Sequence, residues 1–250
     1  MYKILFIGAF LTLLTVLSCG DRGAEETGVN FDITFQATYD GAQLEKDKEY
    51  QLGNIPLFFE SSRLYVSDIT LLKGNQTFQI SEIEYLDFTP TNASFATPTI
   101  TFKNVPEGDY TGIRLGYGVK PALNARTPSD FPAGHPLSVE IDYWSGWSSY
   151  IFSVLDGKAD SNNDGMKNLS FSYHSGSDAV YRTVDFAYPI SVLDGQPGAK
   201  IAFDMKAFLT NDDGTFYDLL ANPATSNSPN NVVVAQALAK HWSRATTVSQ

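Results

Sequence analysis

The sequence predicts an all-β fold: a single antiparallel β-sandwich or barrel-like domain followed by a short C-terminal helix. Apolar and polar residues alternate along a series of short segments, which is the two-residue period of half-buried strands. Turn sequences such as "PEGD", "NNDG" and "LDGQPG" separate these segments. No segment of helical period intervenes between them, and strands at this spacing are typical of sandwiches and barrels.

The N-terminus, residues 1–18, has the character of a lipoprotein signal peptide. One lysine precedes an apolar run that is too short to span a bilayer comfortably, and the chain's single cysteine, Cys19, follows where a lipobox cysteine belongs. We expect Cys19 to be lipidated and to anchor the chain in the bacterial cell envelope, on the periplasmic side or at the outer-membrane surface. The alternative is an ordinary soluble signal with an accidental cysteine. A lipidated Cys19 leaves no thiol for disulfides or thiolate metal binding.

Residues 19–29 are polar, small and acidic, which predicts a flexible tether between the lipid and a domain at 30–250. The sequence has no internal repeat and no second segment of distinct amino-acid composition, so one domain is favoured. Within it, alternation predicts strands in these ranges: 30–39, 64–74, 78–88, 96–105, 110–119, 137–144, 149–157, 168–176, 182–190 and 200–209.

The tail at 231–245, "NVVVAQALAKHWSRA", is expected to be the helix. It places Val233, Ala237, Leu238 and Trp242 at helical spacing, although its run of valines is unfavourable for a helix.

The net charge of −11 argues against a nucleic-acid partner, because few cations are present to neutralise phosphates. It is compatible with binding cations. The sequence has no nucleophile elbow, phosphate loop, dinucleotide-binding glycines or His-Glu-x-x-His motif, so we do not expect an enzyme. Paired catalytic carboxylates far apart in sequence stay open, but no particular pair is marked.

The acidic loop "DSNNDG" places Asp160, Asn162 and Asp164 at the spacing of a calcium-binding loop. The twelfth position of an EF-hand would need a bidentate glutamate, but Phe171 stands there, so this is not an EF-hand. Two interpretations stay open: a polar hairpin turn, which we favour, and a weak calcium site.

A histidine, two tryptophans and several other rings crowd into "HPLSVEIDYWSGWSSYIFSVLDG", and a second histidine follows in "FSYHSG". The chain has only three histidines and three tryptophans, so this crowding calls for an explanation. Imidazole suits copper, zinc and nickel, and histidines that flank an aromatic strand pair are a signal for a metal site. The alternative is a well-filled β core.

Four motifs resemble those of the MbnP-like family, the methanobactin-associated copper-binding proteins of the cell envelope. They are "FFESSRLYVSDITLL", "GDYTGIRLGYGVKPALN", the tryptophan-rich stretch that begins at His135, and "FSYHSG". They occur in the family's order and span most of the chain after the signal peptide.

The resemblance implies a β-rich extracytoplasmic domain that binds copper through histidine side chains and a tryptophan oxidised to kynurenine. Carried over by motif, His135 and His174 are the candidate imidazoles, and Trp144 and Trp147 are the candidate tryptophans, with Tyr150 beside them. The resemblance also implies a dihaem peroxidase-like partner that performs the oxidation.

The spacing of the tryptophans departs from the family pattern, in which one residue separates them. Here Ser145 and Gly146 lie between Trp144 and Trp147, and on a regular strand this spacing directs the two side chains to opposite faces. A bulge at Gly146 would restore a common face.

Two functions therefore stand. The first is a lipid-anchored envelope protein that binds a metal ion, copper before others, for uptake, storage or delivery. The alternative is a structural or adhesive β-sandwich that binds glycan or protein, with calcium stabilising the Asp160 loop.

Overall fold

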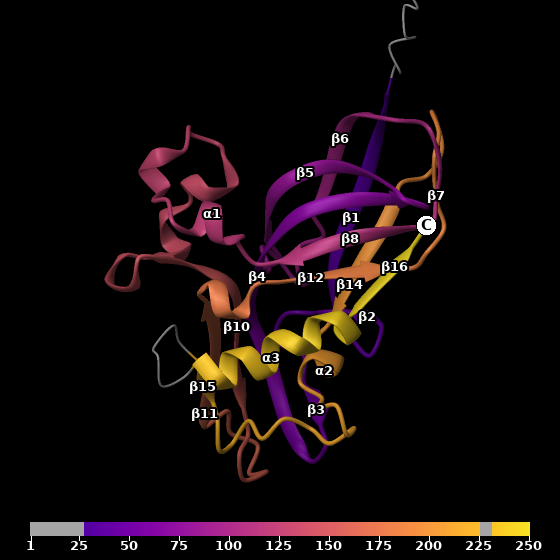
Figure 1. Cartoon of the computed structure of the whole chain (residues 1–250). Helices are drawn as coiled ribbons and strands as arrows, with labels where there is room; N and C mark the ends of the chain where they lie inside the picture. The colour runs from indigo at the N-terminus through magenta and orange to yellow at the C-terminus, as the bar shows by residue number, and fades with distance from the viewer. Residues whose placement is uncertain (1–27, 226–231) are drawn as a thin grey trace, which may run out of the picture.

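The computed structural model describes residues 28–225 and 232–250 and shows a β-rich domain with few helices (Figure 1). The signal peptide and Cys19 lie outside the described residues. In the part of the chain that the structure describes, no helix is both long and apolar enough to cross a membrane.

A five-stranded sheet contains both ends of the described domain. Its order is β16-β14-β1-β2, and β6 pairs with β1. The strands are β1 (Val29–Tyr39), β2 (Ala42–Gln43), β6 (Thr99–Val105), β14 (Ala199–Asp204) and β16 (Thr246–Ser249).

A nine-stranded sheet follows the order β12-β8-β4-β10-β11-β15, with β3 and β5 pairing with β4 and β9 with β10. Its strands are β3 (Tyr50–Leu52), β4 (Ile55–Lys73), β5 (Gln76–Asp87), β8 (Gly112–Tyr117), β9 (Tyr143–Trp144), β10 (Ser149–Ala159), β11 (Leu169–Gly176), β12 (Arg182–Phe186) and β15 (Ala224–Thr225). A separate pair joins β7 (Gly108–Tyr110) to β13 (Ile190–Val192).

The main core lies between the two larger sheets. Phe203 of β14 makes edge contacts with Phe88 and with Tyr117 of the nine-stranded sheet, at ring-centroid distances of 5.9 and 6.5 Å. Tyr39 of β1 meets Phe59 of β4 at 5.8 Å. Aromatic pairs at such distances add to the free energy gained from burying their surface. The packing of sheet on sheet agrees with the predicted sandwich.

The sheets are mixed, so the prediction of purely antiparallel pairing was wrong. β1 pairs with β14 in parallel, from Ile33 opposite Ala199 to Thr38 opposite Asp204, and β11 pairs with β15 in parallel. Parallel neighbours need long crossover connections, so local turn signals carry no information about them.

The prediction of one strand at 137–144 was wrong over most of its length. This segment belongs to an excursion between β8 and β10 that contains α1 (Pro121–Asn124) and four short 3₁₀ turns: η1 (Pro128–Asp130), η2 (Pro136–Ser138), η3 (Glu140–Asp142) and η4 (Ser145–Trp147). The excursion covers one face of the nine-stranded sheet with a second core, in which Leu137 packs with Tyr65 and Tyr150.

The strand predicted at 200–209 ends at Asp204, because Asp204 caps α2 (Met205–Phe208) by accepting a hydrogen bond from the backbone N–H of Ala207 at 3.0 Å. The predicted C-terminal helix is present as α3 (Val232–Ala245). Leu238 and Trp242 face the core as expected, whereas Val233 is 70% exposed.

Candidate functional site

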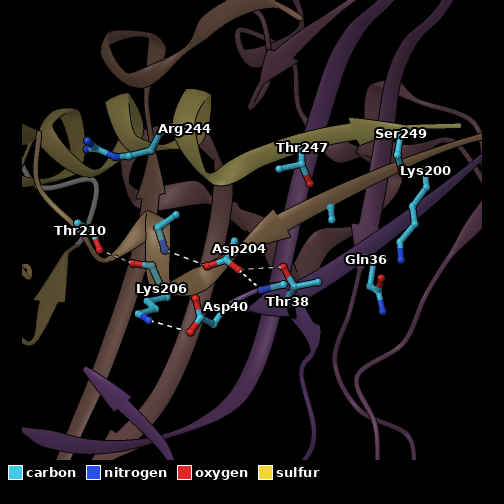
Figure 2. A pocket seen from close by; sticks show the side chains of 13 residues that line it. Gln36, Thr38, Asp40, Lys200, Asp204, Lys206, Thr210, Arg244, Thr247 and Ser249 are labelled. Carbon is cyan, nitrogen blue, oxygen red and sulfur yellow. Dashed lines mark hydrogen bonds and ion pairs between the residues drawn. The ribbon is translucent and has the colours of Figure 1, made fainter. Parts of the chain in front are cut away.

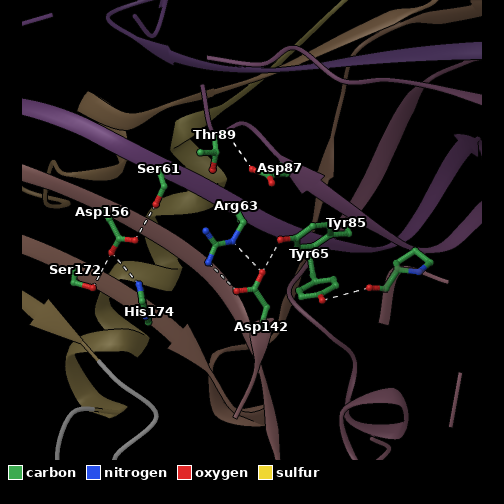
Figure 3. Close-up of polar contacts among 11 residues, drawn as sticks. Ser61, Arg63, Tyr65, Tyr85, Asp87, Thr89, Asp142, Asp156, Ser172 and His174 are labelled. Atoms are coloured by element: carbon green, nitrogen blue, oxygen red, sulfur yellow. Dashed lines mark hydrogen bonds and ion pairs between the residues drawn. The ribbon is translucent and has the colours of Figure 1, made fainter. Parts of the chain in front are cut away.

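The register of three strands brings Asp156 and His174 onto one face of the nine-stranded sheet. On this face Ser61, Asp156 and Ser172 form one row across β4, β10 and β11, and His174 lies opposite Val154 in the next row. Figure 3 shows these side chains pointing toward one another. This part of the face is polar, whereas Leu155, on the other side of β10, belongs to the main core.

The Nε2 atom of His174 lies 2.9 Å from Oδ1 of Asp156. Because an ionised carboxylate only accepts, Nε2 carries the hydrogen and donates it. In the neutral imidazole Nδ1 then keeps its lone pair. A carboxylate that holds one ring nitrogen and leaves the other as a donor to a metal is the usual arrangement around a metal-binding histidine.

Asp156 is itself held by two hydroxyls. Ser61 and Ser172 each donate a hydrogen bond to its carboxylate, at 2.8 and 2.7 Å. Partial burial raises the pKa of Asp156, but the hydrogen bonds from His174, Ser172 and Ser61 and the charge of His174 outweigh burial and hold the pKa below its ordinary value. The carboxylate therefore stays ionised at neutral pH and fixes the orientation of the imidazole.

His135 is arranged differently. It precedes η2 as the N-cap residue, and its Nδ1 accepts a hydrogen bond from the backbone N–H of Leu137 at 3.1 Å. Its ring stacks on Phe131, with centroids 4.5 Å apart, and burial lowers the pKa of the imidazole. The lone pair of Nδ1 is used within the turn, so a metal could bind this ring only if that hydrogen bond were given up.

The structure does not bring the two candidate imidazoles together. Each has its own partners, and among the described residues no ring contact joins either histidine to Trp144 or Trp147. Within residues 28–225 and 232–250 there is also no group of three or more His, Cys, Asp or Glu side chains that could hold a metal ion. Of the two, only His174 keeps a ring nitrogen whose lone pair no described residue uses.

The two candidate tryptophans do come together. The ring centroids of Trp144 and Trp147 lie 4.0 Å apart with an interplanar angle of 33°. The turn η4 makes this contact, because side chains three positions apart eclipse one another in a 3₁₀ turn. Both rings are partly open to solvent, at 38% and 36% exposed. Tyr150, expected beside them, is instead fully buried and donates a hydrogen bond to the carbonyl of Leu137 at 2.8 Å.

A buried ion pair that the sequence analysis missed holds the excursion to the sheet. Asp142 of η3 accepts hydrogen bonds from Nε and Nη2 of Arg63, at 3.0 and 2.9 Å, and from the hydroxyl of Tyr85, at 2.7 Å. Its side chain is 1% exposed. Figure 3 shows Arg63, Tyr85 and Asp142 on the same sheet face as His174. No local motif marks this pair, because its partners lie far apart in the sequence.

The acidic loop between β10 and β11 satisfies its own oxygens. Asp160 accepts from the backbone N–H groups of Asn162 and Asp164 through Oδ1, at 3.3 and 3.2 Å, and from Gly165 through Oδ2, at 2.7 Å. Asp164 accepts from the amide of Asn162 and from the N–H of Met166. Carboxylates turned toward backbone N–H groups form a polar turn, the alternative that the sequence favoured.

The third histidine has a structural position. His241 of α3 is 5% exposed, and its Nδ1 donates to the carbonyl of Phe208 in α2 at 2.7 Å. Burial lowers the pKa of this imidazole.

The fold and this site define a class of protein: a β-rich domain of two packed sheets, one of which carries an aromatic excursion and an oriented imidazole. The family model for MbnP matches residues 28–228, so the chain belongs to the MbnP family. Among solved structures, MbnP from Methylosinus trichosporium aligns with a TM-score of 0.56 at 16% sequence identity, over 88% of this chain and 98% of that chain. At this identity the alignment supports a common fold. No curated protein matches this chain.

Proposed function

We propose that this protein binds copper in the bacterial cell envelope, in the methanobactin-associated role that membership of the MbnP family suggests, and serves uptake, storage or delivery of the metal. Lipidation at Cys19 would hold it at the membrane. The sequence-based expectation that the protein is not an enzyme is part of this proposal.

The observation that carries the proposal is the hydrogen bond from Nε2 of His174 to Oδ1 of Asp156. It orients one imidazole and leaves Nδ1 as a donor atom, and nitrogen-rich sites favour copper(II) over other divalent first-row ions. His135 is the second candidate imidazole from the family motifs, but the structure does not place it beside His174, so it could join this copper only after a rearrangement of its turn. Its ligation costs the hydrogen bond to Leu137, so we expect it to contribute less than His174.

Copper retention by single histidine variants tests this assignment. We expect protein purified from its native envelope to carry copper. His174→Ala should lose most of the copper, His135→Ala should lose less, and His241→Gln should lose none, because His241 serves the packing of α3. Elemental analysis after dialysis measures the content, and thermal melting shows that each variant is folded. Native protein without copper, or His174→Ala with unchanged copper, would overturn the proposal.

The exposure of the tryptophan pair supports a partner that oxidises one of these rings. Because Trp144 and Trp147 are partly open to solvent, a dihaem peroxidase-like protein can reach them without unfolding the domain. Conversion to kynurenine removes one carbon and adds one oxygen. We expect this mass change in the tryptic peptide over Trp144 and Trp147 from native protein, and expect its absence from protein made without the oxidase.

A second candidate function rests on the same exposed pair. Two indoles in contact at the surface form an aromatic platform that suits the face of a sugar ring, which is the adhesive alternative. Quenching of indole fluorescence by envelope glycans, lost in Trp144→Ala and unaffected by His174→Ala, would support adhesion in place of metal binding.

A further inference from the structure

The outer face of the five-stranded sheet contains a hollow of about 560 Å³ that no residue of the proposed copper site lines (Figure 2). Residues of β1, β14 and β16 form its floor, and α2 and the end of α3 close one side. Volumes of this size are typical of small-molecule sites. No role in the proposed function uses this face.

The hollow exists because Ala202, a small side chain, is surrounded on the sheet face by larger side chains. Ala202 of β14 lies opposite Gln36 of β1 and opposite Thr247 of β16. One row further along, Lys200 lies opposite Ser249. Neighbouring strands are about 4.8 Å apart, so the gap over Ala202 is about two strand spacings wide between Gln36 and Thr247. This opening suits a small ligand and is too narrow for a folded partner.

Four polar side chains of the hollow have no hydrogen-bond partner within the described residues: those of Gln36, Lys200, Thr247 and Ser249. Gln36 is 8% exposed, and its Oε1 is closed off from solvent without a hydrogen bond. A buried amide that lacks a partner is costly, and a rotation of the Gln36 side chain toward the hollow would let a ligand supply the missing hydrogen bond. Figure 2 shows Lys200 and Ser249 near Gln36 at the end of the hollow away from α2.

The balance of charge determines which ligand fits. Lys206 pairs with Asp40 at 2.9 Å and Arg244 with Asp212 at 2.7 Å, so two of the cations that line the hollow are already neutralised. At the α2 end of the hollow Asp204 keeps its negative charge, but both of its oxygens already accept hydrogen bonds from the backbone N–H groups of Gly41 and Ala207. Lys200 has no carboxylate partner among the described residues, so it is a lining cation free to meet an anion at the end of the hollow away from α2, whereas Arg244 keeps its ion pair although its Nε and Nη2 have no hydrogen-bond partner.

We propose that this hollow binds a small hydroxylated carboxylate. The carboxylate group meets the ammonium of Lys200 and the hydroxyl of Ser249, while hydroxyl groups of the ligand pair with the amide of Gln36 and the hydroxyl of Thr247. The chain of the ligand lies over the methyl group of Ala202. This site is independent of copper, and each can fail without the other.

Gluconate and sorbitol provide a matched pair of probes, because they differ in a carboxylate against a CH₂OH group. Equilibrium dialysis of the purified full-length protein should show saturable gluconate binding with a Kd of about 1 mM or tighter. Sorbitol should not compete. Lys200→Gln should weaken gluconate binding about tenfold or more, because the lost hydrogen bond is charge-assisted. Lys103→Gln, at an exposed lysine of β6 outside the hollow, should bind as the wild type does.

Gln36→Leu separates binding from folding. It removes an unpaired buried amide, so the melting temperature should stay the same or rise while gluconate binding falls. Absence of saturable gluconate binding, equal competition by sorbitol, or an unchanged Kd in Lys200→Gln would each overturn the proposal. Binding of inorganic phosphate without binding of gluconate would also overturn it, because the site would then select a different anion.

Discussion

The indole rings of Trp144 and Trp147 lie in contact at 4.0 Å even though an extended strand would direct them to opposite faces. The turn η4 produces the contact, and Ser148, with a φ of 49°, returns the chain to β10. The departure from the family spacing is therefore compensated by local backbone geometry. A 3₁₀ turn, and not a bulge at Gly146, brings the two indole rings to a common side.

This contact predicts an exciton signal in circular dichroism. Two indoles so close couple electronically, and the coupling requires both rings. We expect Trp144→Phe and Trp147→Phe each to abolish the couplet to the same extent. Trp242→Phe is the control, since Trp242 stacks with Tyr117 in the core and has no indole neighbour among the described residues. A couplet that survives in either single variant would contradict the geometry.

The pair between Arg63 and Asp142 predicts a large loss of stability on mutation. Removing one partner of a buried ion pair leaves the other charge unpaired, which costs about 3–5 kcal/mol. Asp142→Ala should lower the free energy of unfolding by this amount in urea melts. Asp185→Ala is the matched control, because Asp185 makes the same two-point contact with Arg114 but at an exposed site, where about 0–1 kcal/mol is expected. Equal losses in the two variants would contradict burial as the cause.

The acidic loop predicts a turn that is stable without metal. Asp160 is 4% exposed and accepts three backbone hydrogen bonds, so Asp160→Ala should cost about 1–3 kcal/mol of stability. Because those N–H groups already satisfy the carboxylate, a calcium chelator should leave the melting temperature of the wild type unchanged. A fall in melting temperature on chelation, reversed by added calcium, would instead support the calcium site at Asp160, Asn162 and Asp164.

His241 predicts a pH dependence of stability below neutrality. Burial holds its pKa in the folded state below its unfolded value of about 6.5, so between these two values the unfolded state binds more protons. Stability is therefore fully present above pH ~6.5 and is lost as pH falls toward the folded pKa, by at most about 1.4 kcal/mol per pH unit. His241→Gln should remove this contribution to the pH dependence of the free energy of unfolding, measured by urea melts between about pH 5 and 6.5.

The pKa of His135 is also lowered by burial, so His135→Gln serves as the comparison. His241 is 5% exposed and lies at the contact between α3 and α2. We therefore expect His241→Gln to change the pH dependence of the free energy of unfolding more than His135→Gln does. An identical slope in wild type and His241→Gln would show that the imidazole is not buried in its neutral form.

The hairpin of β10 and β11 could be predicted from the sequence, although β10 is buried over nearly its whole length and only β11 alternates in burial. The ranges 149–157 and 168–176 correspond closely to β10 and β11, because the pairing of these strands is local and one hairpin turn joins them. Alternation reports which face of a strand is covered, and it needs no knowledge of distant segments. The parallel pairing of β1 with β14 could not be predicted, because it joins the two ends of the domain.

The segment at 137–144 misled the prediction for a physical reason. Its alternation has the period of a strand, but Leu137 is buried between the excursion and the sheet, and Asp142 is buried against Arg63. Burial here therefore follows tertiary contacts that the local pattern does not contain. The same limit applies to the candidate site. The candidate histidines and tryptophans could be named from the sequence. The separate surroundings of His135 and His174 could not, because they depend on how the excursion folds over the sheet.

The orienting role of Asp156 predicts a loss of copper affinity without a loss of fold. Asp156→Asn keeps the shape of the side chain and removes the charge that holds Nε2 of His174, so the ring is no longer fixed with Nδ1 as the donor atom. Loss of such a partner typically weakens metal binding about 10–100-fold. Competition with a copper chelator of known affinity measures this change.

Asp87→Asn is the control for this variant. Asp87 pairs in register with Arg63 on the neighbouring β5, so the variant removes one negative charge from the same sheet without touching His174. If general attraction between copper and an acidic surface governed binding, both variants would weaken it equally. If orientation of the imidazole governs it, Asp156→Asn alone is weakened, and Ser61→Ala and Ser172→Ala should show smaller effects in the same direction, because each removes one of the hydroxyls that hold the carboxylate.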